Sequence, residues 1–170
     1  MSLPELGSKQ LRLWSRGALI ASVAFALTAL GLQPITRAAD APPSRLLVIG
    51  HPGTVPARLD ADLLQQAFLK QRMVWPSGAR VVPFNFPPSD PVRVAFDRAA
   101  LGMSPVRSAA YWIDARIRHG LDAPRTVSSA TLAINIVARL PGSIAYVPEA
   151  ALPANVNVVA RIEGDRVVAP

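Results

Sequence analysis

The stretch Arg80–Gly102, RVVPFNFPPSDPVRVAFDRAALG, decides the fold that the sequence predicts. Val81–Phe84 has the β-branched and aromatic character of a buried strand, and the two prolines that follow cannot extend it because each lacks a ladder donor. Ser89 or Asp90 can cap a helix whose first residue is Pro91. The stretch therefore predicts a strand that passes through a short turn into a helix.

The start of this helix suits a small anion. When a strand passes through a tight turn into a helix, the first backbone N–H groups are unpaired and carry the positive end of the helix dipole, so they can bind phosphate-like groups. Arg93 lies in the first helical turn and is suited to clamp an oxyanion, the alternative being a solvated helix arginine. For the whole stretch, the simpler alternative is an ordinary strand–helix connection of an α/β domain.

On both sides of this stretch, strand-like and helix-like segments alternate. Leu46–Gly50 is a continuous apolar run, which is typical of a strand covered on both faces in a parallel sheet. Apolar periodicity and capping residues predict helices over Asp60–Lys70, from Ser104 to His119 and from Ser128 or Ser129 to Leu140, a strand over Ser143–Val147, and a hairpin of Val156–Ile162 and Arg166–Ala169. This order predicts an α/β fold, with a mixed, mostly parallel sheet and helices on its faces.

The helix expected from Ser104 to His119 carries an apolar stripe. The residues that recur at helical spacing are expected to face the core: Val106, Ala109/Ala110, Ile113 and Ile117. The segment after this helix, Leu121–Val127, is expected to be a loop.

The first 39 residues have the layout of a secretory signal peptide. A segment with three basic residues precedes an apolar run of 16 residues, Gly17–Leu32, and small residues follow near Ala39. The run is shorter than the ~18 residues of a membrane-spanning helix, so an uncleaved anchor is the less favoured alternative. We therefore expect cleavage near Ala39, a periplasmic location, and a single domain over residues 40–170.

Composition narrows the classes of function. The chain has no cysteine, which excludes disulfides and thiolate metal sites. Its formal net charge is +7, and four basic residues and one acidic residue precede residue 40, so the rest of the chain carries +4. No clustered basic patch with stacking aromatics is visible, so nucleic acid is not an expected partner, whereas a modest positive field favours anionic ligands. With two histidines and no HExxH, phosphate-loop or GxSxG motif, we expect neither an enzyme nor a bound cofactor or metal.

His51 is a further candidate ligand residue. It directly follows the strand Leu46–Gly50, and open α/β sheets place ligands at the carboxyl ends of their strands. The alternative is a turn histidine that bonds to the backbone.

An ordered set of segments resembles a known family. The segments are Phe68, the Trp75-Pro76-Ser77-Gly78 turn, the strand and helix already described, Tyr111-Trp112, and Pro141–Val147 with the sequence PGSIAYV. They resemble short periplasmic proteins named as phosphate ABC transporter substrate-binding proteins, which have the type 2 periplasmic-binding fold. The resemblance covers about Leu46 to Val159. It implies that the chain corresponds to one lobe, chiefly the second, of receptors that hold an anion between two lobes.

The resemblance also implies site residues. In the two-lobed relatives, the loop that matches Asn85–Phe96 carries an arginine and a Ser-Gly-Thr turn, which surround phosphate. Here Ser89 matches the serine, and Asn85 stands roughly at the position of the arginine. Asp90 stands in place of the glycine and Pro91 in place of the threonine. Proline removes a backbone donor and aspartate adds negative charge, so both changes weaken phosphate binding.

Two functions are consistent with these features. The first is a periplasmic solute-binding module for phosphate or another small oxyanion, with the site residues Ser89, Asn85, Arg93 and His51. Such a module would work with the membrane component of an ABC transporter, or with a second copy that supplies the missing lobe. The alternative is a non-catalytic periplasmic protein-interaction module that has lost its ligand.

Overall fold

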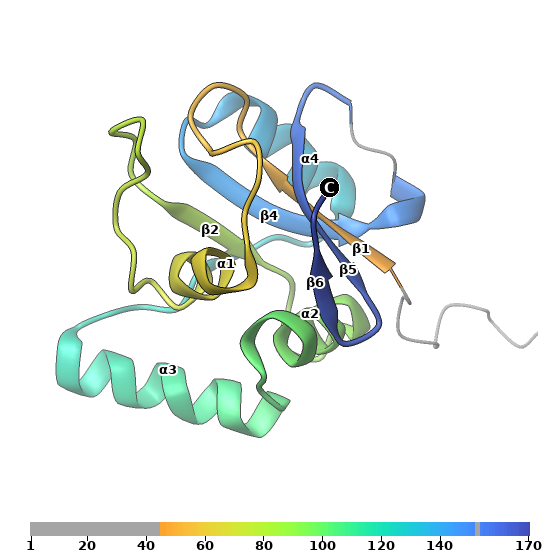
Figure 1. Cartoon of the computed structure of the whole chain (residues 1–170). Helices are drawn as coiled ribbons and strands as arrows, with labels where there is room; N and C mark the ends of the chain where they lie inside the picture. The colour runs from red at the N-terminus through yellow and green to blue at the C-terminus, as the bar shows by residue number, and fades with distance from the viewer. Residues whose placement is uncertain (1–44, 152–153) are drawn as a thin grey trace, which may run out of the picture. The chain divides into compact units, whose positions relative to one another are not determined.

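A computed structural model describes residues 45–151 and 154–170 of the chain (Figure 1). The expected signal peptide and its cleavage site lie outside these residues. The elements of the described part are, in order, β1 (Arg45–Gly50), α1 (Ala61–Phe68), β2 (Val82–Asn85), α2 (Pro91–Leu101), α3 (Pro105–His119), β3 (Arg125–Thr126), α4 (Ala130–Arg139), β4 (Ser143–Pro148), the 3-10 turn η1 (Glu149–Ala151), β5 (Asn157–Glu163) and β6 (Arg166–Val168).

The helices begin and end where local chemistry predicts. Each of the four α-helices has a side chain that accepts a hydrogen bond from a backbone N–H of its first turn, and the four capping residues are Asp60, Asp90, Ser104 and Ser129. Gly102 and Gly120 end α2 and α3 with φ of 63° and 64°, in the left-handed region that glycine adopts without strain. These caps confirm the predicted boundaries of α2 and α3.

The strands form one mixed sheet in the order β3-β2-β4-β1-β5-β6. β2 pairs in parallel with β3 and β4, whereas β1 pairs antiparallel with both β4 and β5, and β5 with β6. The α/β class and the mixed sheet are confirmed, but antiparallel pairs outnumber parallel ones. β1 is buried, as its apolar run predicts. Both of its neighbours in the sheet are antiparallel, so it is not the parallel strand that the run was expected to form.

Helices cover both faces of the sheet, and β4 shows how its residues alternate between them. The ring of Tyr146 points to the side of α1 and α2, where it stacks on Phe96 with ring centroids 3.8 Å apart and also contacts Phe68. Ser143 points to the other side, where its hydroxyl donates to the carbonyl of Leu140 at the end of α4. Figure 1 shows the same arrangement, with α1 and α2 on one side of β4 and α4 on the other. The core therefore has two apolar layers around a central sheet.

The prediction for the buried side of α3 is wrong. The predicted core residues Val106, Ile113 and Ile117 are 79%, 62% and 79% exposed. Trp112 and two small residues, Ser108 and Ala115, are buried in their place. The helix carries apolar residues on two opposite sides, and the side with the large indole packs against the protein. We call the solvent-facing set, Val106, Ala109, Ala110, Ile113 and Ile117, the outer face of α3.

Two smaller findings complete the fold. The segment expected to be a loop, Leu121–Val127, contains the short strand β3, which extends the sheet beside Phe84 and Asn85. Among residues 45–151 and 154–170, no helix has the length and apolar character needed to cross a membrane.

Candidate functional site

The N-terminal tip of α2 is capped by a group of its own chain. The Asp90 carboxylate accepts a hydrogen bond of 2.8 Å from the N–H of Val92. The N–H of Asp90 donates to the carbonyl of Pro87 at 2.9 Å, and Pro91 has no N–H to offer. The negative group that the helix dipole favours at this tip is thus a side chain of the protein. An incoming oxyanion would meet the charge of Asp90 at the same place.

Asn85 lies just before the turn that leads to this tip, and Ser89 lies within it. Ser89 is exposed in the turn itself. Asn85 ends β2 and is only 2% exposed; its carbonyl accepts from the N–H of Val127 at 2.8 Å. Its side-chain Oδ1 is buried and has no hydrogen-bond partner among the described residues. This oxygen is an acceptor and cannot hold an anion, so only the amide nitrogen of Asn85 could donate to one.

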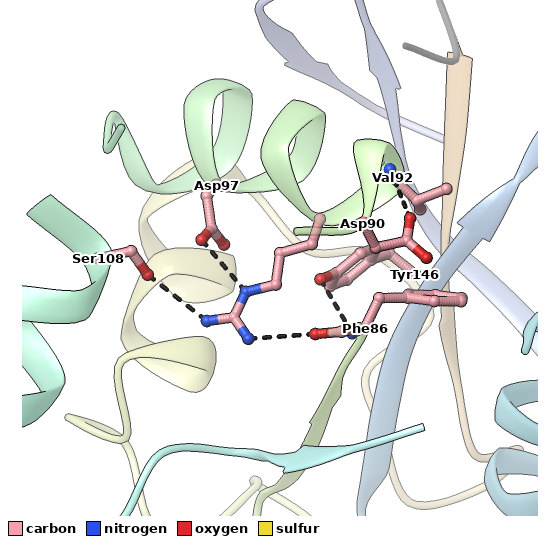
Figure 2. A network of polar contacts seen from close by, with 7 residues as sticks. Phe86, Asp90, Val92, Asp97, Ser108 and Tyr146 are labelled. Atoms are coloured by element: carbon pink, nitrogen blue, oxygen red, sulfur yellow. Dashed lines mark hydrogen bonds and ion pairs between the residues drawn. The ribbon is translucent and has the colours of Figure 1, made fainter. Parts of the chain in front are cut away.

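Arg93 points into the protein and is 7% exposed. Its Nε lies 3.3 Å from Oδ2 of Asp97, one helical turn along α2. Its two terminal nitrogens donate to the carbonyl of Phe86 at 3.1 Å and, at a longer 3.5 Å, to the hydroxyl of Ser108. Figure 2 shows Asp97, Ser108 and Phe86 on three sides of the guanidinium. Arg93 therefore joins α2, the end of β2 and α3, and is neither a solvated helix arginine nor free to clamp an anion in this arrangement.

Burial raises the pKa of two groups in this network, the Asp97 carboxyl and the Tyr146 phenol. The pKa of Asp97 is raised above its ordinary value because loss of water outweighs the opposing effects of Arg93 and the Ser108 hydroxyl. Burial also raises the pKa of the Tyr146 phenol, whose oxygen accepts a long hydrogen bond of 3.4 Å from the N–H of Phe86. The peptide groups of Phe86 are therefore held by Tyr146 at its N–H and by Arg93 at its carbonyl (Figure 2). These contacts fix the turn into α2 and hold its polar groups within the chain.

His51 lies apart from the other three predicted site residues. Its N–H donates to the carbonyl of Ser143, the first residue of β4, at 3.0 Å. Thr54 Oγ1 accepts from the N–H of Gly142 at 2.8 Å and shares a second hydrogen bond of 2.8 Å with His51 Nδ1. β2 runs parallel to β4, with Val82 beside Ser143. It therefore ends, at Asn85, on the side of the sheet where β4 also has its carboxyl end. β1 runs antiparallel to β4, so the carboxyl ends of β1 and β2 lie at opposite ends of the strands. The structure therefore does not bring His51 to the tip of α2.

Surface hollows of about 450, 210 and 530 Å³ are among those in the part of the chain that the structure describes, and none of the four predicted site residues lines these. The hollow of about 530 Å³ has the strongest positive charge, because Lys70, Arg80 and Arg125 lie around it. Asp122 also lines it, and this carboxylate lies 3.6 Å from Nε of Arg116. The residue numbers of these cations gave no indication that they come together, because they belong to three separate segments.

α3 contacts the rest of the chain through its inner side, by the buried ring of Trp112 and two hydrogen bonds. The Tyr111 hydroxyl donates to the carbonyl of Leu69 at 3.0 Å, and the ring of Tyr111 meets that of Trp112 edge-on at 5.0 Å. Ser108 is the α3 residue that Arg93 reaches. In Figure 1, α3 lies at the periphery, beyond α2. The outer face is thus an apolar surface on the side of α3 opposite these contacts.

Comparisons with known proteins bear on the fold. No protein-family model and no curated protein matches the sequence. The structure is similar to the crystal structure of an ABC-type phosphate transport receptor from Vibrio cholerae, with a TM-score of 0.52 and 10% sequence identity. The similarity covers 70% of this chain and 47% of that receptor, so the chain spans about half of the receptor's length. At this identity the likeness concerns the fold alone: this chain has the α/β fold of part of a phosphate-binding receptor.

Proposed function

We propose that this chain is a non-catalytic periplasmic module that keeps the fold of one receptor lobe and acts by binding a protein through the outer face of α3. The observation that carries the proposal is the exposure of Val106, Ile113 and Ile117 on one side of α3, whose opposite side packs against the protein. Removing such a side chain from water is worth about 1.5–3 kcal/mol. Contiguous exposed apolar surface of this kind marks interaction sites.

The closed tip of α2 supports the loss of the oxyanion ligand. Receptor-like capture at this tip needs free donors and a positive side chain. Here Asp90 supplies a negative charge, Pro91 lacks a donor, and Arg93 is enclosed by protein groups. The fold is that of a binding receptor, and we propose that a protein contact has replaced the small ligand.

Two measurements test this function. Isothermal titration of the protein with inorganic phosphate at millimolar concentration and low salt should give no saturable heat. Co-purification from periplasmic extract should recover a protein bound to the wild type. The double variant Ile113→Asp/Ile117→Asp should lose that protein, whereas Leu132→Asp, which adds a charge at a 41% exposed apolar residue of α4, should retain it. Equal recovery of the bound protein with both variants would rule out the outer face of α3 as the binding surface.

Capture of a small anion in the positive hollow is a second candidate function. None of Lys70, Arg80 and Arg125 forms an ion pair with an acidic side chain in residues 45–151 and 154–170, so the hollow attracts anions. If phosphate does give saturable heat, the double variant Arg80→Ser/Arg125→Ser should abolish it, and Asp90→Asn should not. If the saturable heat of phosphate binding persists in the double variant, the hollow is not the phosphate site.

A further inference from the structure

We infer that the protein bound by the outer face of α3 is a second copy of this chain, with the two α3 helices antiparallel across a two-fold axis. The inference rests on the proposed function, because it names the partner of the same surface. Two-fold pairing requires a surface that is complementary to itself, in apolar contacts and in charge. The outer face of α3 meets both conditions.

The large apolar residues form one stripe on the side of α3 that faces away from the protein. At about 100° per residue, Val106, Ile113 and Ile117 lie within about 40° of one another around the helix axis. The buried residues Trp112 and Ala115 lie on the opposite side. The stripe runs about 16 Å along the axis, given a rise of about 1.5 Å per residue. It is long enough to pack against one other helix.

The stripe has the same pattern when read from either end. Val106 and Ile117 are placed symmetrically about the middle of α3, between positions 111 and 112, and so are Ala110 and Ile113. In an antiparallel pair that crosses at this point, Val106 of one copy faces Ile117 of the other, and Ala110 faces Ile113. Each isoleucine then meets a smaller side chain. The small alanines let the two axes approach to the ~8–10 Å of packed helices.

The charged borders of the stripe are also compatible with self-association. Arg107, Asp114 and Arg118 lie on one border, so each Arg107 comes within about 3 Å, measured along the axis, of both Asp114 and Arg118 in the other copy. Asp114 lies nearer to the stripe than Arg118 does, so the carboxylate is the closer of the two charges to Arg107. Two equivalent ion pairs result. Asp114 also pairs with Arg118 of its own chain, whose Nε lies 2.6 Å from Oδ1, so in the dimer this carboxylate lies between two arginines. On the other border, Arg116 is paired with Asp122 of its own chain, which reduces repulsion between copies.

Other occupants fit this surface less well. An acidic protein segment or an anionic membrane would be attracted by the arginines, but it would have no positive group to offer Asp114. Neither would use the two-fold symmetry of the stripe. One helix pair buries less than the ~1,200 Å² of standard interfaces, so the dimer is expected to be weak and concentration-dependent.

Charge reversal tests the inference by sedimentation equilibrium on the protein as purified from cells. Arg107→Asp and Asp114→Arg each put like charges into both symmetric contacts, so each should weaken dimerisation about tenfold or more. An equimolar mixture of the two variants should restore it to the wild-type level, because every reversed residue then meets the opposite sign in the mixed dimer. The control Arg139→Asp makes the same charge change on the exposed end of α4 and should leave the dimer unchanged.

The outcomes separate this inference from the proposed function. A wild-type protein that stays monomeric at its highest soluble concentration, or a mixture no tighter than either variant alone, overturns the second copy as partner. If the monomer still binds another periplasmic protein and Ile113→Asp/Ile117→Asp abolishes that binding, the proposed function stands without the dimer. If neither interaction depends on these residues, both are wrong. Binding of a monomer to anionic vesicles through the same residues would also overturn the dimer.

Discussion

The N-terminal tip of α2 and the outer face of α3 belong to consecutive helices but present opposite chemistry. At the tip, polar groups find partners in their own chain: Asp90 caps its helix, and Arg93 is surrounded by Asp97, Phe86 and Ser108. On the outer face, Val106 and Ile117 are each 79% exposed, on a helix whose opposite side packs against the protein. Most polar groups of the first region are paired within the chain, the buried Oδ1 atoms of Asn85 and Asp97 being exceptions among the described residues, whereas the apolar side chains of the second region are left uncovered.

This difference indicates where a partner is needed. A satisfied polar group gains little from a ligand, because a new hydrogen bond must replace an existing one. Exposed apolar surface gains free energy from any contact that removes it from water. The two regions are consistent with our proposal that this chain binds a partner at the surface of α3 rather than an anion at the loop before α2.

Replacement of Arg93 should have the largest effect. Arg93→Met should lower the free energy of unfolding by about 3–5 kcal/mol, because it leaves Asp97 buried without its charge partner. Arg98→Met, at an exposed position of the same helix, should change it by less than about 0.5 kcal/mol. Urea denaturation measures both. If the two variants were equally stable, Arg93 would be available for a ligand and the tip would not be closed.

The raised pKa of Asp97 predicts a dependence of stability on pH. The folded protein binds the proton of Asp97 more tightly than the unfolded chain does. This group's contribution should therefore fall as pH rises from about 4, the unfolded value, to the raised pKa of the folded state, and be constant above it. The slope cannot exceed about 1.4 kcal/mol per pH unit for one proton. Urea denaturation between pH 4 and pH 7 should show it in the wild type, and Asp97→Asn should lack it; an identical slope in both would contradict the assignment.

The cap of α2 should have an intermediate effect. Asp90→Ala should cost about 1 kcal/mol of stability, because the N–H of Val92 loses its acceptor. Asp90→Asn keeps an acceptor at this position and should cost only a few tenths of a kcal/mol. Thermal unfolding of the two variants separates the cap from the charge. A gain of phosphate binding by Asp90→Asn would show that the carboxylate alone closes the tip.

Truncation on the outer face should have the smallest effect on the single chain. Ile113→Ala should change the free energy of unfolding by less than about 0.5 kcal/mol, because this side chain is 62% exposed. Ile144→Ala, at a fully buried position of β4, should cost about 2–5 kcal/mol. The measurement uses dilute protein, so that self-association does not contribute. A large loss for Ile113→Ala would mean that the outer face is packed within the chain.

Much of the fold could be predicted from the sequence because helix ends are set by local chemistry. Ser104 followed by Pro105, and Gly120 fifteen residues later, fix the limits of α3 without reference to any other element. The Glu163-Gly164-Asp165 turn likewise marks the hairpin of β5 and β6, with Gly164 at a φ of 58°. These signals lie within a few residues of the structure that they determine.

The remaining features depend on contacts between distant segments. The apolar run of β1 shows that the strand is buried, but not that β4 and β5 flank it antiparallel, and this pairing separates His51 from Asn85. The stripe of α3 shows an amphipathic helix, but Trp112 on the other side decides which side is buried. For Arg93, the spacing of four residues to Asp97 was a readable sign of an internal ion pair. Its contacts with Phe86 and Ser108 were not readable, because they depend on the packing of three elements.

The place of β1 in the sheet has a consequence for synthesis. Leu47 is paired with Val147 and Arg161, a hundred or more residues later in the chain. A ribosome or an export channel delivers the strand LLVIG long before either neighbour exists, so its backbone edges and apolar side chains stay uncovered throughout delivery. Contacts of such separation form slowly, and an open strand edge pairs readily with foreign chains. A chain released before Asn157 would keep one edge of its central strand bare, and we expect such a fragment to aggregate or be degraded rather than accumulate.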